Sequence, residues 1–189
     1  MAIAIICAST TARTTRRLAG RDGLGQRSRG FGGAHTGPNP TDRAKQGCKR
    51  HLLTEARHGI PLVVKTSPAN VHDSQRAIEL LDAMPTIPGR RGRPREKPDA
   101  ALGDRAYGTP KNIAACRQRG IVPLLARIGT EHGSGLGTFR WVVERSLAWF
   151  GHCRRLKLCY EKTGDHFQAF HDLAAVLICA RKLQWLRRF

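Results

Sequence analysis

The stretch DAALGDRAYGTPKNIAACRQRGIVPLLA, residues 99–126, predicts a strand, a helix and a second strand in close succession. The apolar runs at its two ends are short and are bounded by turn residues, as buried strands are. Between them, Thr109 is placed to cap a helix, with Pro110 at its first position and Gly120 just past its end. Strands that alternate with helices in this way favour a sheet with helices packed on it.

The segments on either side extend this pattern. The β-rich runs 48–56 and 60–67 predict a hairpin with Gly59 at the turn. Apolar residues in helical spacing predict three further helices, over 73–84, 138–158 and 165–186. The order hairpin, helix, strand, helix, strand, helix, helix predicts an α/β fold in which a mixed sheet is flanked by helices.

Residues 1–33 differ from the rest of the chain. They are rich in Thr, Arg and Gly, contain the single acid Asp22, and show no sustained apolar period beyond AIAII. This composition predicts a poorly ordered basic arm. The folded domain would then cover residues 34–189 and would be incomplete, because the strand needed to open a five-stranded sheet is doubtful or missing.

Charge is the strongest compositional signal. The chain has 33 Lys and Arg against 14 Asp and Glu, a formal net charge of +19. Such an excess favours a polyanionic partner, and nucleic acid is the commonest one. No apolar run approaches the roughly 20 residues of a membrane-spanning helix. The six cysteines are scattered, which predicts reduced thiols, no structural zinc and a cytoplasmic protein without a membrane partner.

Two acids are candidate site residues in this basic chain, Asp104 and Glu144. Asp104 follows a predicted strand, and the carboxyl ends of strands are where open α/β sheets build their sites. Glu144 lies one turn after Arg140 on a predicted helix whose tryptophans suggest burial all round, so its carboxylate should be paired or bind metal. Pairing with neighbouring arginines is the simpler interpretation. Two carboxylates within a basic surface also suit two-metal phosphoryl transfer.

Three segments, 36–74, 90–108 and 132–161, resemble the IS5-type transposases of bacterial insertion sequences. The resemblance rests on an Asp-x-x-Tyr-Gly strand end, an Arg-x-x-x-Glu helix and an Asn-x-His-Asp-Ser turn, and it runs from about residue 32 to the C-terminus. It implies an RNase H-like fold of the DDE group, here truncated or frame-shifted at its start. The implied activity is metal-dependent cleavage at transposon ends followed by strand transfer into target DNA, without a covalent enzyme intermediate.

The resemblance also assigns roles to particular residues. Asp104 would be the second metal-binding Asp, Glu144 the metal-binding Glu, and Arg140 a phosphate contact. The metal would be two Mg²⁺ or Mn²⁺ ions. The first Asp of the family lies on the opening strand, and in this chain only Asp22 is near that position, without an apolar strand before it. We therefore predict a fragment or decayed copy with little or no activity on its own.

The implied partners are double-stranded DNA, both transposon ends and target, and a second copy of the chain on that DNA. No small-molecule substrate is expected, and the protein would act at the bacterial nucleoid. The DNA backbone would be held by basic residues, namely Lys49, Arg50, Arg91, Arg93, Arg105 and Arg140. Arg91-Gly92-Arg93-Pro94 also resembles an AT-hook core that enters a narrow minor groove, although a solvated basic loop is the simpler interpretation.

Other polar residues have two interpretations each. Asp73, beside His72, could join a metal site or cap the helix that follows it. His132 lies in a glycine-rich loop and could face substrate, and Asp42 could stabilise its own turn. The apolar stripe on 165–186 could pack in the core or form a dimer surface.

Three functions remain open at this stage. The favoured one is a DDE transposase. A non-catalytic basic DNA-binding remnant would keep the charge without the chemistry. An RNA-binding protein of the translation machinery has only the charge in its favour.

Overall fold

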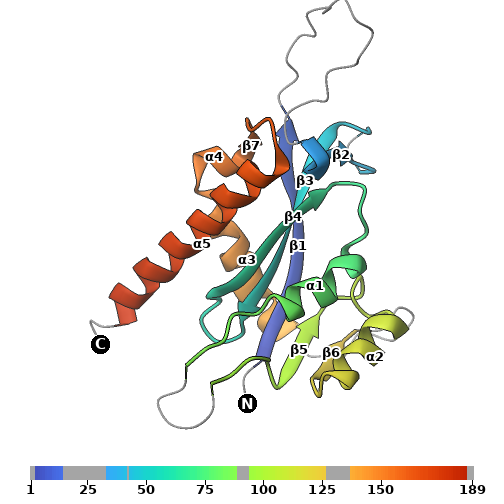
Figure 1. Cartoon of the computed structure of the whole chain (residues 1–189), viewed down its shortest axis with the longest axis vertical. Coiled ribbons are helices and arrows are strands. Elements are labelled where there is room, and N and C mark those ends of the chain that lie inside the picture. The colour runs from blue at the N-terminus through green and yellow to red at the C-terminus, as the bar shows by residue number, and fades with distance from the viewer. Residues whose placement is uncertain (1–2, 15–32, 42, 89–93, 127–136, 187–189) are drawn as a thin grey trace, which may run out of the picture.

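The computed structural model describes residues 3–14, 33–41, 43–88, 94–126 and 137–186 (Figure 1). For residues 3, 7–14, 137, 138, 140 and 186 it describes the backbone alone. Asp22, Asp42, Arg91, Arg93 and His132, which the sequence singled out, lie outside the described residues.

A mixed sheet forms the centre of the molecule. Its long central strand is β1 (Ile3–Thr14). On one side β3 (Gln46–Glu55) pairs antiparallel with β1, and β4 (Pro61–Pro68) pairs antiparallel with β3. On the other side β5 (Ala100–Gly103) and β6 (Val122–Leu125) add parallel strands. The short strands β2 (Gly37–Pro38) and β7 (Leu158–Cys159) pair with β3 and β1. The predicted α/β class is confirmed.

The prediction of a poorly ordered arm over residues 1–33 is wrong for Ile3–Thr14. These residues form β1, so the opening strand is present and pairs with β3 and β5. Ala4, Ile5 and Ile6 are each at most 3% exposed, because a strand between two others is buried on both faces and shows no alternation. The later half of β1 contains three threonines, which suit strands through their β-branched side chains.

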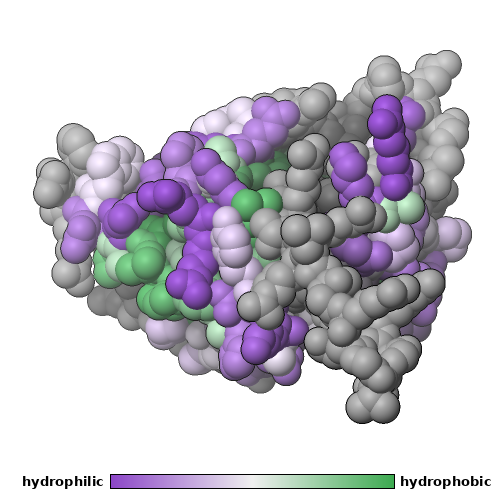
Figure 2. Space-filling model, turned by 90° about the horizontal axis from the view of Figure 1, so that it is seen from above, coloured by the Kyte–Doolittle hydropathy of each residue, from purple (hydrophilic) through white to green (hydrophobic). Residues whose placement is uncertain are grey.

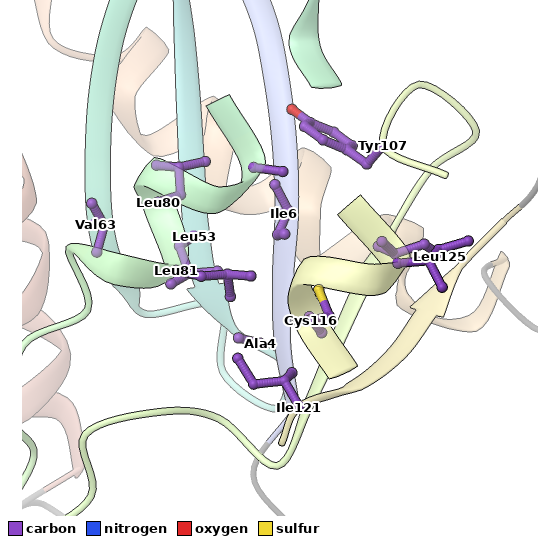
Figure 3. Close-up of a cluster of buried hydrophobic side chains, with 13 residues drawn as sticks. Ala4, Ile6, Leu53, Val63, Leu80, Leu81, Tyr107, Cys116, Ile121 and Leu125 are labelled. Carbon is purple, nitrogen blue, oxygen red and sulfur yellow. The ribbon is translucent and has the colours of Figure 1, made fainter. Parts of the chain in front are cut away.

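Helices cover both faces of the sheet (Figure 1). One face packs against α1 (Ala77–Asp82), which the 3₁₀ turn η2 (Asp73–Arg76) precedes, and α2 (Pro110–Gln118). Figure 3 shows this core, in which Ile6 of β1 meets Leu53, Leu80 and Leu81. The other face packs against α3 (Gly137–Gly151), α4 (Arg154–Lys157) and α5 (Gly164–Leu186). A further 3₁₀ turn, η1 (Gly33–His35), contacts β4 and α5.

Several local predictions are confirmed. Helix α2 begins after Thr109, whose hydroxyl accepts a hydrogen bond from the backbone N–H of Asn112, and Gly120 follows the helix with φ +68°. Gly59 lies in the turn between β3 and β4 with φ +68°, where a side chain would be strained. Of the helices in the described ranges, none is long and apolar enough to cross a bilayer.

The Gly59 turn packs closely on α3. The Ser146 hydroxyl of α3 donates to the Gly59 carbonyl over 2.8 Å, and a Cβ at Gly59 would lie 2.5 Å from that hydroxyl oxygen. Arg145, on the same helix, donates to the carbonyl of His58 over 2.7 Å. These contacts fix α3 across the end of the β3–β4 hairpin.

Candidate functional site

Asp104 lies where the sequence predicts it, directly after β5 at the carboxyl end of that strand. Its carboxylate accepts a hydrogen bond from the backbone N–H of Ala106 over 2.9 Å, which closes the turn into Tyr107. Desolvation raises the pKa of Asp104, and the charge of nearby Asp73 raises it further, while the hydrogen bonds from the turn lower it. The site therefore begins with an acid whose charged form is held back by its surroundings.

The acid whose charge further raises the pKa of Asp104 is Asp73, for which a metal site and a helix cap were the two interpretations. Asp73 begins η2 and forms an ion pair with Lys49 of β3, with 3.0 Å between Nζ and Oδ1. Lys49 also donates to the carbonyl of Val71 over 3.0 Å. The helix cap is His72, whose ring accepts a hydrogen bond from the N–H of Ser74, so the prediction that Asp73 caps the helix is wrong.

Glu144 lies in the middle of α3 and is exposed. The face of α3 that packs on the sheet carries Val142, Ser146 and Phe150, all buried. Trp141 is 53% exposed, so the helix is not buried all round as its sequence suggested. Solvent reaches Glu144, and desolvation therefore does not force its carboxylate to bind metal.

The strand next to Asp104 contains no acid. The parallel register pairs Ile6 with Gly103, which brings Cys7 level with Asp104, and Ile3–Thr14 contains neither Asp nor Glu. Asp22 comes 22 − 14 = 8 residues after Thr14 in the sequence and lies outside the described residues. The carboxylate that the resemblance places on this strand is therefore missing from it.

The described donors do not fit the predicted pair of metal ions. Mg²⁺ and Mn²⁺ take oxygen ligands, and two-ion sites need several carboxylates at one place. Among the described residues no three His, Cys, Asp or Glu side chains form a group that could hold a metal. The acid beside Asp104 is Asp73, which Lys49 already neutralises.

The residues predicted to hold DNA have different surroundings in the structure. Arg50 is 3% exposed, donates to the carbonyl of Leu156 over 3.2 Å and lies 5.5 Å from the centre of the Phe150 ring, so its assignment as a DNA contact is wrong. Lys49 is half-buried in its ion pair with Asp73. Arg105 is exposed beside Asp104. Arg140 lies on α3, but only its backbone is described.

A second group of side chains was missed. Trp141, Arg145 and Trp149 follow one another at intervals of four on α3, so they lie on one side of the helix. Trp141 and Arg145 line a hollow of about 280 Å³ together with Lys182 and Trp185 of α5, and Lys182 also lies over the ring of Trp149. The spacing on α3 is visible in the sequence, but tryptophans at these positions were interpreted as part of a buried helix.

Comparison with known proteins gives two matches of different kinds. The family described as the transposase DDE domain matches residues 5–179, a range that begins within β1. A protein of Burkholderia cepacia, assigned as the transposase of insertion sequence element IS402, is 44% identical over 188 residues, which cover 94% of this chain and 89% of that protein. No solved structure matches the chain.

Proposed function

Because this chain belongs to the DDE transposase family and is thereby a DNA transposase, we propose that it binds double-stranded transposon DNA but cannot cut it unaided. The family depends on divalent metal for its chemistry. The observation that carries the proposal is the acid-free strand β1 beside Asp104. We also propose that it is of the IS5 type, which the resemblance of the three sequence motifs supports.

The chemistry explains why one missing carboxylate matters. In a two-ion mechanism the metals stabilise the attacking and leaving oxygens of phosphate, and carboxylates from several elements fix both ions. Asp104 and Glu144 are the two acids that we assign to this role, and β1 supplies no third. Magnesium, or manganese in its place, would be held too weakly for efficient cleavage and strand transfer.

Binding needs only the charge that the chain retains. A net charge of +19 favours DNA through release of counterions, and this term survives the loss of a carboxylate. Arg105 beside Asp104, and Arg154 and Lys157 of α4, are exposed basic residues of the described surface. We assign the phosphate backbone to these residues and, by resemblance, to Arg140.

A homodimer on DNA is part of the proposal. Helix α5 exposes Leu173, Val176 and Leu177 by 52%, 63% and 49%. Figure 2 shows hydrophobic residues at the surface on the side of α5, bordered by hydrophilic ones. A second copy of the chain would bury these side chains, and exposed apolar patches commonly mark such interaction sites. The place of action would be the nucleoid.

The test combines binding with cleavage. Anisotropy of a labelled duplex should report binding that weakens steeply as salt rises. Supercoiled plasmid incubated with the chain and Mg²⁺ or Mn²⁺ should remain intact. Metal-dependent nicking by the wild type that disappears in Asp104→Asn would overturn the proposed loss of cleavage, and absence of duplex binding would overturn the rest.

Placing an acid on β1 tests whether the missing carboxylate on that strand is the reason that metal is not held. Cys7→Asp and Ala8→Asp, made separately, each place a carboxylate on the strand next to Asp104. We expect one of them to bind Mn²⁺ measurably in calorimetry, with the binding lost when Asp104→Asn is added. If neither variant binds Mn²⁺ more tightly than the wild type, β1 is not where the metal site fails.

A further inference from the structure

We propose that a separate site on α3 and α5 binds unpaired nucleotides of DNA, by stacking bases on tryptophan and holding phosphates with lysine and arginine. We name this site the tryptophan ladder. Its lining residues are Arg57, His58, Trp141, Arg145, Lys182 and Trp185, with Trp149 between the two helices. The inference rests on the proposed function only in that the chain meets DNA.

Aromatic rings and cations alternate along the ladder. The Arg145 guanidinium lies 4.4 Å from the ring centre of Trp141 and 5.3 Å from that of Trp149. The Lys182 ammonium lies 4.6 Å from the ring of Trp149 and 5.2 Å from that of Trp185. The order is therefore tryptophan, arginine, tryptophan, lysine, tryptophan. Cations over ring faces are attracted by the ring quadrupole, which holds both kinds of group in place.

The two ends of the ladder are open to solvent. Trp141 is 53% exposed and Trp185 is 50% exposed, which is unusual for the largest apolar side chains in a protein. Half-exposed rings, held by a cation, are surfaces on which a base can stack. Stacking of this kind depends little on base identity, since every base has a π face.

The charge around the hollow is positive. Arg57, Arg145 and Lys182 contribute three cations to its lining. Glu55 contacts this lining, with its carboxylate 3.4 Å from the His58 ring and accepting the backbone N–H of His58 over 2.7 Å. Three cations in the lining of one hollow favour an anion there.

The position of the turn is fixed, which preorganises the hollow. Arg145 donates to the carbonyl of His58 over 2.7 Å, so the guanidinium is anchored at one end while its plane lies between two rings. Ser146 holds the carbonyl of Gly59 over 2.8 Å. A rigid site loses little conformational entropy when a ligand binds.

Size and chemistry favour an unpaired nucleotide over a duplex. The hollow of about 280 Å³ is slightly smaller than the usual ligand pocket, for which the range starts at about 300 Å³. Bases inside a duplex have both faces covered by their neighbours, so the rings could not stack on them. A nucleotide outside a duplex offers a flat face for Trp141 or Trp185 and a phosphate for Lys182 or Arg57.

The chain provides its own reporter for this site. It has three tryptophans, and all three belong to the ladder, so intrinsic fluorescence reports on this place alone. We would titrate the full chain with single-stranded oligothymidine, with an abasic oligonucleotide of the same length, and with heparin. Quenching is expected with oligothymidine, because stacking needs bases. The abasic strand and heparin carry the charge without them.

Variants locate the effect. Trp141→Ala and Trp185→Ala should each weaken oligothymidine binding by about 5-fold to 150-fold, and Trp185→Phe should restore most of the loss. Lys182→Gln should weaken binding and lower its salt dependence. Matched controls away from the ladder are Tyr160→Ala, an aromatic residue that is 49% exposed, and Lys111→Gln, an exposed lysine of α2. Neither should change binding to oligothymidine.

Three results would overturn the proposal. The first is an abasic strand that quenches as strongly as oligothymidine. The second is that Trp141→Ala and Trp185→Ala both bind oligothymidine as tightly as the wild type does. Fluorescence that changes with protein concentration but not with DNA, together with a dimer in sedimentation, would assign the ladder to contact between copies. Duplex binding and nicking are measured separately, so failure of the ladder leaves the proposed function standing, and the reverse also holds.

Discussion

The two faces of the central sheet handle charge in different ways. On the α1 face the cation Lys49 of β3 pairs with the acid Asp73, and that pair lies beside Asp104. On the α3 and α5 face the next residue of β3, Arg50, is buried against a carbonyl and the ring of Phe150. On the α1 face Lys49 is thus neutralised by an acid of the chain. On the other face Arg50 is held by an aromatic ring and a carbonyl instead.

The largest expected effect comes from breaking the α3 face at its turn. Gly59→Ala would add a Cβ 2.5 Å from the Ser146 hydroxyl oxygen, at a residue whose φ of +68° already disfavours side chains. Strain and overpacking together should lower the free energy of unfolding by about 2–4 kcal/mol, measured by urea denaturation. Tryptophan fluorescence should change as well, because the same turn borders the ladder.

Gly151→Ala is the matched control for that variant. Gly151 ends α3, and a Cβ built there meets nothing within 4 Å. Its unfolding free energy should stay within about 1 kcal/mol of the wild type, since alanine favours a helix over glycine by about that amount. Equal losses in the two variants would show that the close approach at Gly59 does not matter.

The second prediction compares neighbours on opposite faces. Lys49→Met leaves the Asp73 carboxylate without its cation beside Asp104, so the variant should lose about 1–3 kcal/mol of unfolding free energy at neutral pH. Arg50→Met removes a cation whose pKa burial lowers to about 10, and whose Nε atom finds no hydrogen-bond partner among the described residues. That change should alter stability by less than about 1.5 kcal/mol.

Urea denaturation of both variants at neutral pH decides this comparison. The difference between the two faces disappears if Arg50→Met is as destabilised as Lys49→Met. In that case the buried Arg50 guanidinium stabilises the fold as much as the Lys49–Asp73 ion pair does.

Sequence signals predicted the elements whose evidence is local. The Gly59 hairpin, the Thr109 cap and the strand before Asp104 each depend on a few adjacent residues, and all are present. The strand β1 was missed because its burial comes from β3 and β5, which lie far away in the chain. Without those neighbours, a run of threonine and arginine has the composition of a flexible segment.

The site was predictable only in part for the same reason. Asp104 needed only the end of its strand to be recognised, but the nearness of Asp73 requires η2 to fold back over the sheet edge. Arg50 was assigned to DNA because basic residues in a row give no sign of which face each will take. The ladder joins α3 to residues about forty positions later in the chain, and the spacing on one helix does not show that contact.

The smallest effect expected is a gain. Desolvation raises the pKa of Asp104 above its unfolded value of 3.8, so the folded state holds this proton more tightly than the unfolded state does. Stability contributed by this group therefore falls as pH rises from 3.8 through the raised pKa, and at neutral pH the ionised carboxylate destabilises the fold.

Asp104→Asn removes the charge, and its amide oxygen can still accept the N–H of Ala106. The variant should be more stable than the wild type at neutral pH, by less than about 1 kcal/mol because Asp104 is exposed, and equal to it below pH 3.8. An acid without which the fold would be more stable is a candidate for a functional role, because stability does not explain its presence. If urea denaturation shows the same difference between the variant and the wild type at both pH values, the charge of the Asp104 carboxylate does not destabilise the fold.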